Sequence, residues 1–156
     1  MSLERRNVIF HIDVNSAFLS WEATYRLHHL GGKEDLREKV SAVGGDMAMR
    51  HGIILAKSIP AKKFHIKTGE TILEAKQKCP ELILVPPNYG LYEKCSKAFM
   101  DILRRYSPDV EQYSIDEAFV DMTGTEGLWG DPVTAAYRMK DQIRDTLGFT
   151  VNIGIS

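Results

Sequence analysis

The sequence predicts an α+β fold in which helices pack on one face of a mixed or antiparallel sheet, with a small subdomain inserted into the chain. Three observations predict it. Residues 7–14 form a nearly continuous apolar run, which is typical of a buried strand in a sheet covered on both faces. Two further apolar runs, 110–114 and 118–122, flank a short polar bend and predict an antiparallel hairpin. Apolar residues recur at helical spacing before and after this hairpin, over 88–106 and 131–147.

Helical signals follow the first strand directly. They begin at Asn15 or Ser16 and continue to about Leu30, where Gly31-Gly32 ends the helix. The next stretch, 31–79, has shorter elements and more lysine, and we expect it to form the inserted subdomain. Its expected elements are strands at 40–43 and 53–57, a turn at Gly44-Gly45-Asp46, and helices at 61–65 and 70–78. Pro80 prevents the last helix from continuing beyond Lys78.

The rest of the chain returns to the main unit, which we expect to comprise residues 1–30 and 80–156. Asp131-Pro132 starts a helix, because it combines a capping carboxylate with proline at the first helical position. The apolar face of this helix is expected to comprise Val133, Ala136, Met139, Ile143 and Leu147. The other elements expected here are a strand at 82–85, a loop at 124–130 and a last strand at 149–155.

Composition places broad limits on function. Of the 156 residues, 44% are hydrophobic and 26% charged, the balance of a globular domain. The formal net charge of −1 lacks the basic surplus of a free-standing DNA-binding domain, so a basic surface must be local or lie outside this chain. No apolar run approaches the length of about eighteen residues that spans a membrane, and the polar N-terminal residues do not resemble a signal peptide. Cys79 and Cys95 show no metal-like spacing, so we expect a cytoplasmic protein with reduced thiols.

Asp13 is the first candidate for chemistry. It closes an otherwise apolar strand where the chain turns into a helix, a place where α/β proteins often bind ligands. The alternative for Asp13 is a helix N-cap, because aspartate is a favoured cap. His11, two residues earlier, shows no metal-ligand pattern by itself.

Asp116 and Glu117 are adjacent acids at or near the predicted hairpin bend. Carboxylates this close repel each other unless a cation screens them, and hard cations such as Mg²⁺ prefer carboxylate oxygens. The alternative is an ordinary exposed turn. Phosphoryl transfer uses two cations about 4 Å apart, and three acids from two neighbouring strands would meet that need.

The sequence motifs around these acids resemble the catalytic motifs of Y-family translesion DNA polymerases, of the UmuC/DinB type. The first word, Asp13-Val14-Asn15-Ser16-Ala17-Phe18, opens on aspartate and places an aromatic residue five positions later, as in that family. The second and most specific word is Ser114-Ile115-Asp116-Glu117-Ala118-Phe119, which closely matches the family's Ser-Ile-Asp-Glu-Ala-aromatic motif. Residues 67–70, the long helix and 151–156 are also similar to the family in order and spacing, so the resemblance covers nearly the whole chain.

The resemblance implies a palm, 1–30 with 80–156, and a fingers insertion, 31–79. It also implies a metal centre that carries template-directed nucleotidyl transfer. The residues that would bind two Mg²⁺ ions, with Mn²⁺ as a substitute, are the catalytic acids Asp13, Asp116 and Glu117, and the backbone carbonyl of Val14.

The resemblance further implies a nucleotide site. The amides of Ser16, Ala17 and Phe18 would face the incoming deoxynucleoside triphosphate, as free N–H groups at a helix start can. Phe18 would be the steric gate, which packs under the sugar and clashes with a ribose 2′-hydroxyl. The alternative for Phe18 is an ordinary core residue.

One motif departs from the usual sequence of the family. Where the family usually has aromatic-Glu-Ala-Arg to grip the β- and γ-phosphates, this chain has Ile59-Pro60-Ala61-Lys62. Lys62 keeps the charge but lacks the bidentate fork of arginine, and Ile59 supplies no phenolic hydroxyl. Triphosphate binding is therefore expected to be weaker or arranged differently. The alternative for Lys62 is a solvated surface lysine.

The resemblance implies primer-template DNA as the partner. The short apolar runs predict no membrane association. In the family the sequence continues beyond the position of Ser156 with the rest of the palm, a thumb and a little-finger domain. We therefore expect this chain to be a fragment with little polymerase activity alone, and a sliding clamp would be contacted through the absent C-terminal region. The first alternative is a catalytically weak domain that binds nucleotide or a partner in the DNA-damage response. A nuclease or cyclase that uses the same acids is the second.

Overall fold

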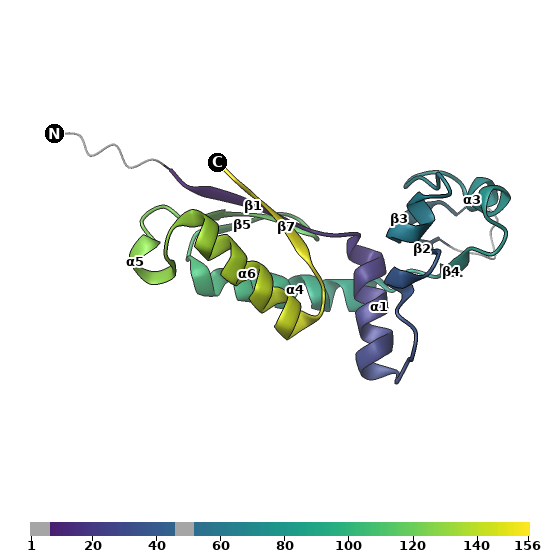
Figure 1. The fold of residues 1–156 in the computed structure, drawn as a ribbon, viewed down its shortest axis with the longest axis horizontal. Helices are drawn as coiled ribbons and strands as arrows, with labels where there is room; N and C mark the ends of the chain where they lie inside the picture. Colours follow the sequence, from purple (N-terminus) through teal and green to yellow (C-terminus); the bar gives the residue numbers. More distant parts are fainter. Residues whose placement is uncertain (1–6, 46–51) are drawn as a thin grey trace. The chain divides into compact units, whose positions relative to one another are not determined.

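The computed structural model describes residues 7–45 and 52–156 of the chain. It divides into two compact units, one comprising Met1–Asn15 with Glu93–Ser156 and the other Ser16–Tyr92 (Figure 1). The expected boundaries had placed the first helix and the strand at 82–85 with the main unit. In the structure both belong to the second unit.

The first unit contains a four-stranded sheet in the order β5-β6-β1-β7. All neighbouring strands in it are antiparallel. The strands are β1 (Ile9–Val14), β5 (Val110–Ser114), β6 (Glu117–Asp121) and β7 (Val151–Ile155). The helices that accompany this sheet are α4 (Tyr89–Tyr106), α5 (Glu126–Trp129) and α6 (Pro132–Leu147). This confirms the predicted antiparallel hairpin and both long helices.

The two faces of this sheet differ. Phe10, Ile12 and Val14 alternate along β1 with side chains of the opposite face and are buried. Each such burial contributes about 1.5–3 kcal/mol to stability. Helices α4 and α6 lie together along one side of the sheet (Figure 1). Ile9, His11 and Asp13 point to the other face and are only partly buried. The sheet therefore has one packed face and one open face, as is common in antiparallel sheets, and the expectation that this strand is covered on both faces is wrong.

The loop expected at 124–130 is wrong, because the chain forms α5 there. The indole Nε1 of Trp129 donates to the carbonyl of Tyr106 over 3.0 Å, and the two rings lie 4.5 Å apart. These contacts join segments distant in sequence, so no local pattern announces the helix. The expected face of α6 also needs one correction. Val133 is 57% exposed, and Ala135 is buried instead.

The second unit contains a three-stranded sheet in the order β3-β2-β4. Strand β2 (Ser41–Gly44) pairs antiparallel with β3 (Ile54–Lys57) and parallel with β4 (Ile83–Val85). The helices are α1 (Ala17–His29), the 3-10 helix η1 (Leu36–Glu38), α2 (Ile59–Lys62) and α3 (Ile72–Lys78). Helix α1 packs against η1, β2 and β3 through a core of buried Leu, Ala and Val side chains.

The short helices begin where capping hydroxyls place them. Helix α2 begins before the expected Ala61 because Ser58 accepts a hydrogen bond from the Ala61 amide. Helix α3 begins after the expected Glu70 because Thr71 caps it. Of the predicted Gly44-Gly45-Asp46 turn, Gly44 ends β2, and Asp46 lies outside the described residues.

Replacing Ser58 with alanine is expected to lower the free energy of unfolding by about 2–3 kcal/mol. The buried Ser58 hydroxyl accepts from the amides of Ser41 and Ala61, both over 3.1 Å, and donates to the Lys39 carbonyl over 2.6 Å. Urea unfolding measures the loss. Thr71→Ala is the matched control, because it removes a single exposed cap worth about 1 kcal/mol. A Ser58→Ala loss no larger than that of the control would contradict the prediction.

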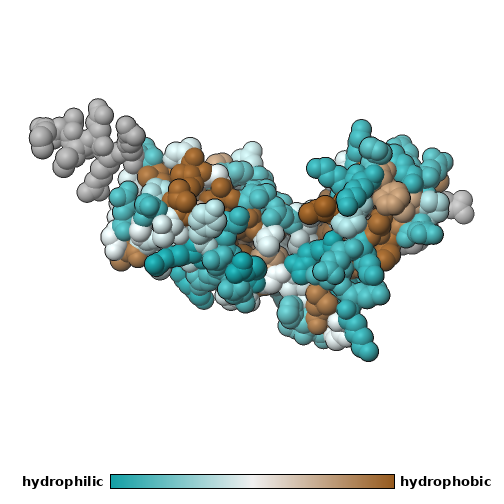
Figure 2. Space-filling model, viewed as in Figure 1, coloured by the Kyte–Doolittle hydropathy of each residue, from teal (hydrophilic) through white to brown (hydrophobic). Residues whose placement is uncertain are grey.

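Figure 2 shows hydrophilic residues over most of each unit in this view, with smaller hydrophobic areas among them. Within residues 7–45 and 52–156, no helix combines the length and the apolar character needed to cross a membrane.

Candidate metal centre

The three predicted acids come together on the backbone of the first unit. Asp13 of β1 and Glu117 of β6 are directly opposite each other in the antiparallel register. Side chains of such a pair lie on the same face with Cβ atoms about 4.5–5.5 Å apart. The amide of Val14 donates to the carbonyl of Asp116 over 3.0 Å, which holds the backbone of the hairpin bend beside the end of β1.

Asp13 lies within β1, while the N-cap position of α1 belongs to Ser16, so the capping interpretation of Asp13 is wrong. Glu117 is the first residue of β6, and both Asp116 and Glu117 are partly buried. The pair is therefore more enclosed than an ordinary exposed turn.

Two neighbours hold the carboxylates in place. Ser114 Oγ lies 2.9 Å from Asp116 Oδ1 and 3.0 Å from Glu117 Oε2. A hydroxyl carries one proton, so Ser114 donates to one carboxylate at a time and links the two. On its other side, Glu117 Oε1 lies 3.2 Å from His11 Nε2. The His11 ring in turn packs against Phe119, with centroids 4.9 Å apart.

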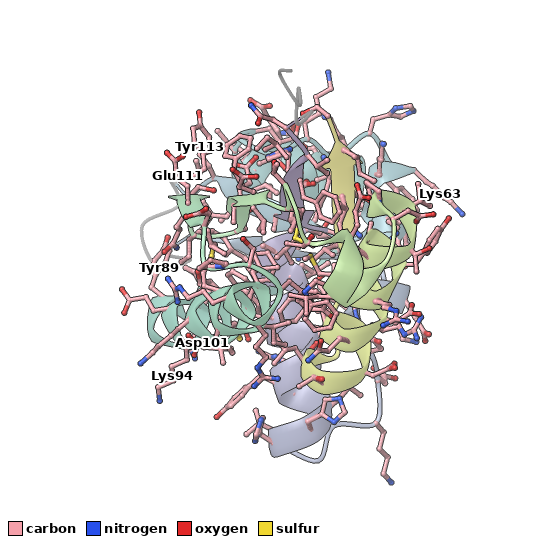
Figure 3. The ribbon with its side chains drawn as sticks, turned by 90° about the vertical axis from the view of Figure 1, so that its left-hand side faces the viewer. Lys63, Tyr89, Lys94, Asp101, Glu111 and Tyr113 are labelled. Atoms are coloured by element: carbon pink, nitrogen blue, oxygen red, sulfur yellow. The ribbon has the colours of Figure 1, made fainter. Side chains whose placement is uncertain are left out.

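Sequence reasoning assigned no role to His11. The signal was available, because residues two apart on a strand share a face and His11 precedes Asp13 by two. On the same open face, Glu111 and Tyr113 project outward from β5 (Figure 3). Tyr113 is 69% exposed and packs edge-on against Phe119.

The hairpin bend is also tied to helix α4. The buried hydroxyl of Ser96 donates to the carbonyl of Ile115, the residue before Asp116. Gln112 Nε2 donates to Ser96 Oγ over 3.3 Å and to the Ser114 carbonyl over 3.2 Å. Sequence reasoning missed Ser96 and Gln112, because these contacts depend on how the helix meets the hairpin.

The donor set suits a hard cation. Three carboxylates and nearby backbone carbonyls offer only oxygen ligands, the kind that Mg²⁺ prefers. Among the described residues, no three His, Cys, Asp or Glu side chains converge in a metal-holding arrangement. Glu117 is instead turned toward His11 and Ser114.

The predicted nucleotide-binding residues belong to the second unit. The first intrahelical hydrogen bond of α1 runs from the Ser20 amide to the Ser16 carbonyl over 2.9 Å. The amides before Ser20, including those of Ala17 and Phe18, therefore have no partner one turn earlier in the helix. Ser16 adopts a left-handed φ of 43°, which makes the sharp change from strand to helix.

Phe18 is partly buried, and its side chain packs against the buried core cluster that contains Leu19 and Ala23. Its ring stacks on Tyr92 with centroids 4.5 Å apart and planes 9° from parallel. Lys62 is exposed at the end of α2, and Ile59 of the same word is 74% exposed. The exposure of Lys62 fits a phosphate contact and a solvated lysine equally well.

Comparison with known proteins supports the motifs. The family model described as the impB/mucB/samB family matches residues 12–156. The chain is 49% identical over 150 residues to DNA polymerase IV of Clostridium acetobutylicum, covering 96% of this chain and 37% of that protein. It is 40% identical over 151 residues to DNA polymerase IV of Acetivibrio thermocellus, covering 97% of this chain and 36% of the relative. The chain thus spans little more than a third of these relatives.

Solved structures agree with the fold. The crystal structure of DinB from Sulfolobus solfataricus matches with a TM-score of 0.82 and 25% identity, over 96% of this chain and 42% of that one. An insertion ternary complex of Dbh DNA polymerase matches with a TM-score of 0.81 and 26% identity, over the same shares of the two chains. The chain therefore belongs to the impB/mucB/samB family, which confirms the resemblance to Y-family DNA polymerases that its motifs carry.

Proposed function

We propose that this chain is the palm and fingers portion of a DNA-directed DNA polymerase that carries out translesion synthesis. The observation that carries the proposal is the strand register that pairs Asp13 with Glu117 on the open face of the sheet. Asp116 precedes Glu117 directly, at the hairpin bend. These acids stand within the family's motifs in a chain that belongs to the family. Relatives named DNA polymerase IV support the same activity.

Asp13, Asp116, Glu117 and the backbone carbonyl of Val14 would hold two Mg²⁺ ions, with Mn²⁺ as a substitute. When bound, such ions stabilise the charge that develops on the attacking and leaving oxygens of an in-line displacement. Ser114 and His11 would orient the Glu117 carboxylate as partners that do not bind the metal themselves. Each contacts one of its two oxygens.

The nucleotide would be held by the second unit. The amides of Ser16, Ala17 and Phe18 would bind the triphosphate at the start of α1, where free N–H groups and the helix dipole favour anions. Lys62 would add charge, and the neighbouring Lys63 projects outward as well (Figure 3). Phe18 would exclude ribonucleotides as the steric gate.

Primer-template DNA would be the partner. A Dbh DNA polymerase structure described as a post-insertion binary complex, similar to this chain with a TM-score of 0.81, supports it. Because the chain spans only 37% of its Clostridium acetobutylicum relative, we propose that thumb, little-finger and clamp contacts lie outside it and that it has little activity alone.

Primer extension tests the proposal. The full-length protein, given Mg²⁺, a labelled primer and each of four templates, is expected to add the deoxynucleotide complementary to the template base. Addition should stop when the metal is chelated. Cleavage of the DNA or cyclisation of the nucleotide would instead favour a nuclease or a cyclase. Nucleotide addition that ignores the template would contradict the proposal.

The departure of the α2 motif from the family sequence supports a second candidate function. The candidate is a catalytically weak domain that binds nucleotide or a partner in the DNA-damage response. Ile59 and Lys62 stand where the family usually has an aromatic residue and an arginine, and both are exposed. Nucleotide binding without any incorporation by the full-length protein would favour this candidate.

Ser114→Ala is expected to raise the Mg²⁺ concentration required for half-maximal activity by about tenfold or more, because partners that orient metal ligands are typically worth that much in affinity. A Mg²⁺ titration of primer extension measures the shift. Ser107→Ala is the matched control, since Ser107 donates to the Asp121 carbonyl at the far end of the same hairpin. An equal shift in both variants would show that general loosening of the hairpin is responsible.

A further inference from the structure

The proposed gate residue belongs to a compact aromatic cluster within the second unit, formed by Phe18, Trp21, Tyr89 and Tyr92. Besides stacking in parallel on Tyr92, the Phe18 ring contacts two more aromatic rings. Its centroid lies 6.1 Å from that of Trp21 and 6.2 Å from that of Tyr89, which it meets edge-on. Tyr89, labelled in Figure 3, also packs edge-on against Tyr92 at 5.9 Å. Tyr92 is thus the flat surface on which the Phe18 ring rests.

Tyr92 is fixed at both ends. Its ring is 0% exposed, and its backbone amide donates to the Asn88 carbonyl over 3.1 Å. Its hydroxyl donates to Glu22 Oε1 over 2.9 Å. Glu22 is itself 4% exposed, and its other oxygen lies 3.6 Å from Arg26 Nε. A buried carboxylate with a cation behind it is a strong hydrogen-bond acceptor.

Burial and the neighbouring carboxylate of Glu22 raise the pKa of the Tyr92 hydroxyl well above its ordinary value. The hydroxyl therefore remains protonated and able to donate throughout the neutral range. Phe18 and Glu22 are four residues apart on α1, so they lie on the same side of that helix and meet the same tyrosine. One helix thus supplies both the ring and the acceptor that holds the surface beneath it.

A parallel stack at 4.5 Å restricts the plane of the Phe18 ring, because tilting it would drive its edge into Tyr92. A steric gate works by a clash of defined geometry, and a displacement of about 1 Å is enough to weaken such an effect strongly. The orientation of the Phe18 ring therefore depends on how rigidly Tyr92 is held.

We propose that Glu22 and Tyr92 are positioning residues that set discrimination between deoxyribose and ribose by holding the ring plane of Phe18. The proposal rests on the function of Phe18 as the gate. Neither residue need touch the nucleotide, since Tyr92 acts through Phe18 and Glu22 acts through Tyr92.

The test is the ratio of kcat/KM for a deoxynucleotide to that for the matching ribonucleotide, measured in the full-length protein. Tyr92→Phe keeps the ring and removes the hydroxyl, and is expected to lower this ratio about tenfold. Glu22→Met keeps the volume, removes the acceptor and should do the same without altering either ring. Glu22→Gln keeps an acceptor oxygen and should retain most of the discrimination. Tyr106→Phe is the matched control, since Tyr106 lies at the other end of α4 and its buried hydroxyl donates to Gln142 of α6.

The Phe18→Val background separates the outcomes. Tyr92→Phe should have no further effect on the ratio there, because the ring that it positions is gone. An equal effect in both backgrounds would overturn the proposal, and so would unchanged discrimination in Tyr92→Phe and Glu22→Met while Phe18→Val lowers it. Unchanged discrimination in Phe18→Val would remove the gate itself, and the proposal with it, while the polymerase activity would still stand.

Discussion

Asp13→Asn is expected to lower kcat/KM for deoxynucleotide incorporation by about 10³-fold or more. The substitution keeps the shape of the side chain but removes the charge that would hold two cations, and metal stabilisation of developing charge is worth several kcal/mol. Glu117→Gln should lower kcat/KM to a similar extent, and the double variant should lose little more, because residues that act as one unit are not additive. Single-turnover primer extension over a series of nucleotide concentrations, from well below to well above saturation, measures the effect.

The control for this prediction is Asp121, which lies on the same strand as Glu117 and on the same face of the sheet as Asp13. Asp121 is four residues beyond Glu117 on β6, and its carboxylate accepts a hydrogen bond from the Thr123 amide over 3.0 Å. Asp121→Asn removes a charge from the open face but keeps an acceptor for that bond. Its activity should remain near that of the wild type. If Asp121→Asn and Asp13→Asn lost activity equally, the general charge of the face rather than a metal centre would be responsible.

Phe18→Val is expected to increase ribonucleotide incorporation relative to deoxynucleotide incorporation by roughly 100-fold. The smaller side chain would no longer clash with the 2′-hydroxyl, and steric rejection of one group is typically worth about 10- to 200-fold. Measuring the incorporation of the ribonucleotide and of the deoxynucleotide opposite the same template base gives the ratio directly.

Deoxynucleotide incorporation by Phe18→Val should change far less than ribonucleotide incorporation. A parallel loss of both activities would show that Phe18 supports the fold through its aromatic neighbours and does not read the sugar. Thermal unfolding of the variant, compared with that of Tyr89→Val from the same cluster, distinguishes these effects.

Local pattern was sufficient to predict the elements that carry the chemistry. The apolar run of β1, the two apolar runs of the hairpin and the Asp131-Pro132 start of α6 each predicted their own element, so these elements are confirmed. The acids were found for the same reason, since they interrupt apolar strands at specific points. Their roles as metal ligands stay a prediction. The open face of β1 was not predicted.

Features that depend on distant contacts could not be predicted. Helix α5 is held by the bond from Trp129 to Tyr106, and the parallel pairing of β4 with β2 joins segments about forty residues apart. The contacts of Ser96 with Ile115 and of Glu22 with Tyr92 are likewise tertiary. Such side chains become visible only when the packing of one element against another is known.

The most direct test of the metal centre is calorimetric titration of this chain with a deoxynucleoside triphosphate, with and without Mg²⁺ or Mn²⁺. Wild type is compared with Asp116→Ala, and with Asp109→Ala as a matched acid from the other end of the same hairpin. A metal centre predicts binding that requires the cation, is lost in Asp116→Ala and is retained in Asp109→Ala. Binding that ignores the cation, or that survives in folded Asp116→Ala, would contradict it.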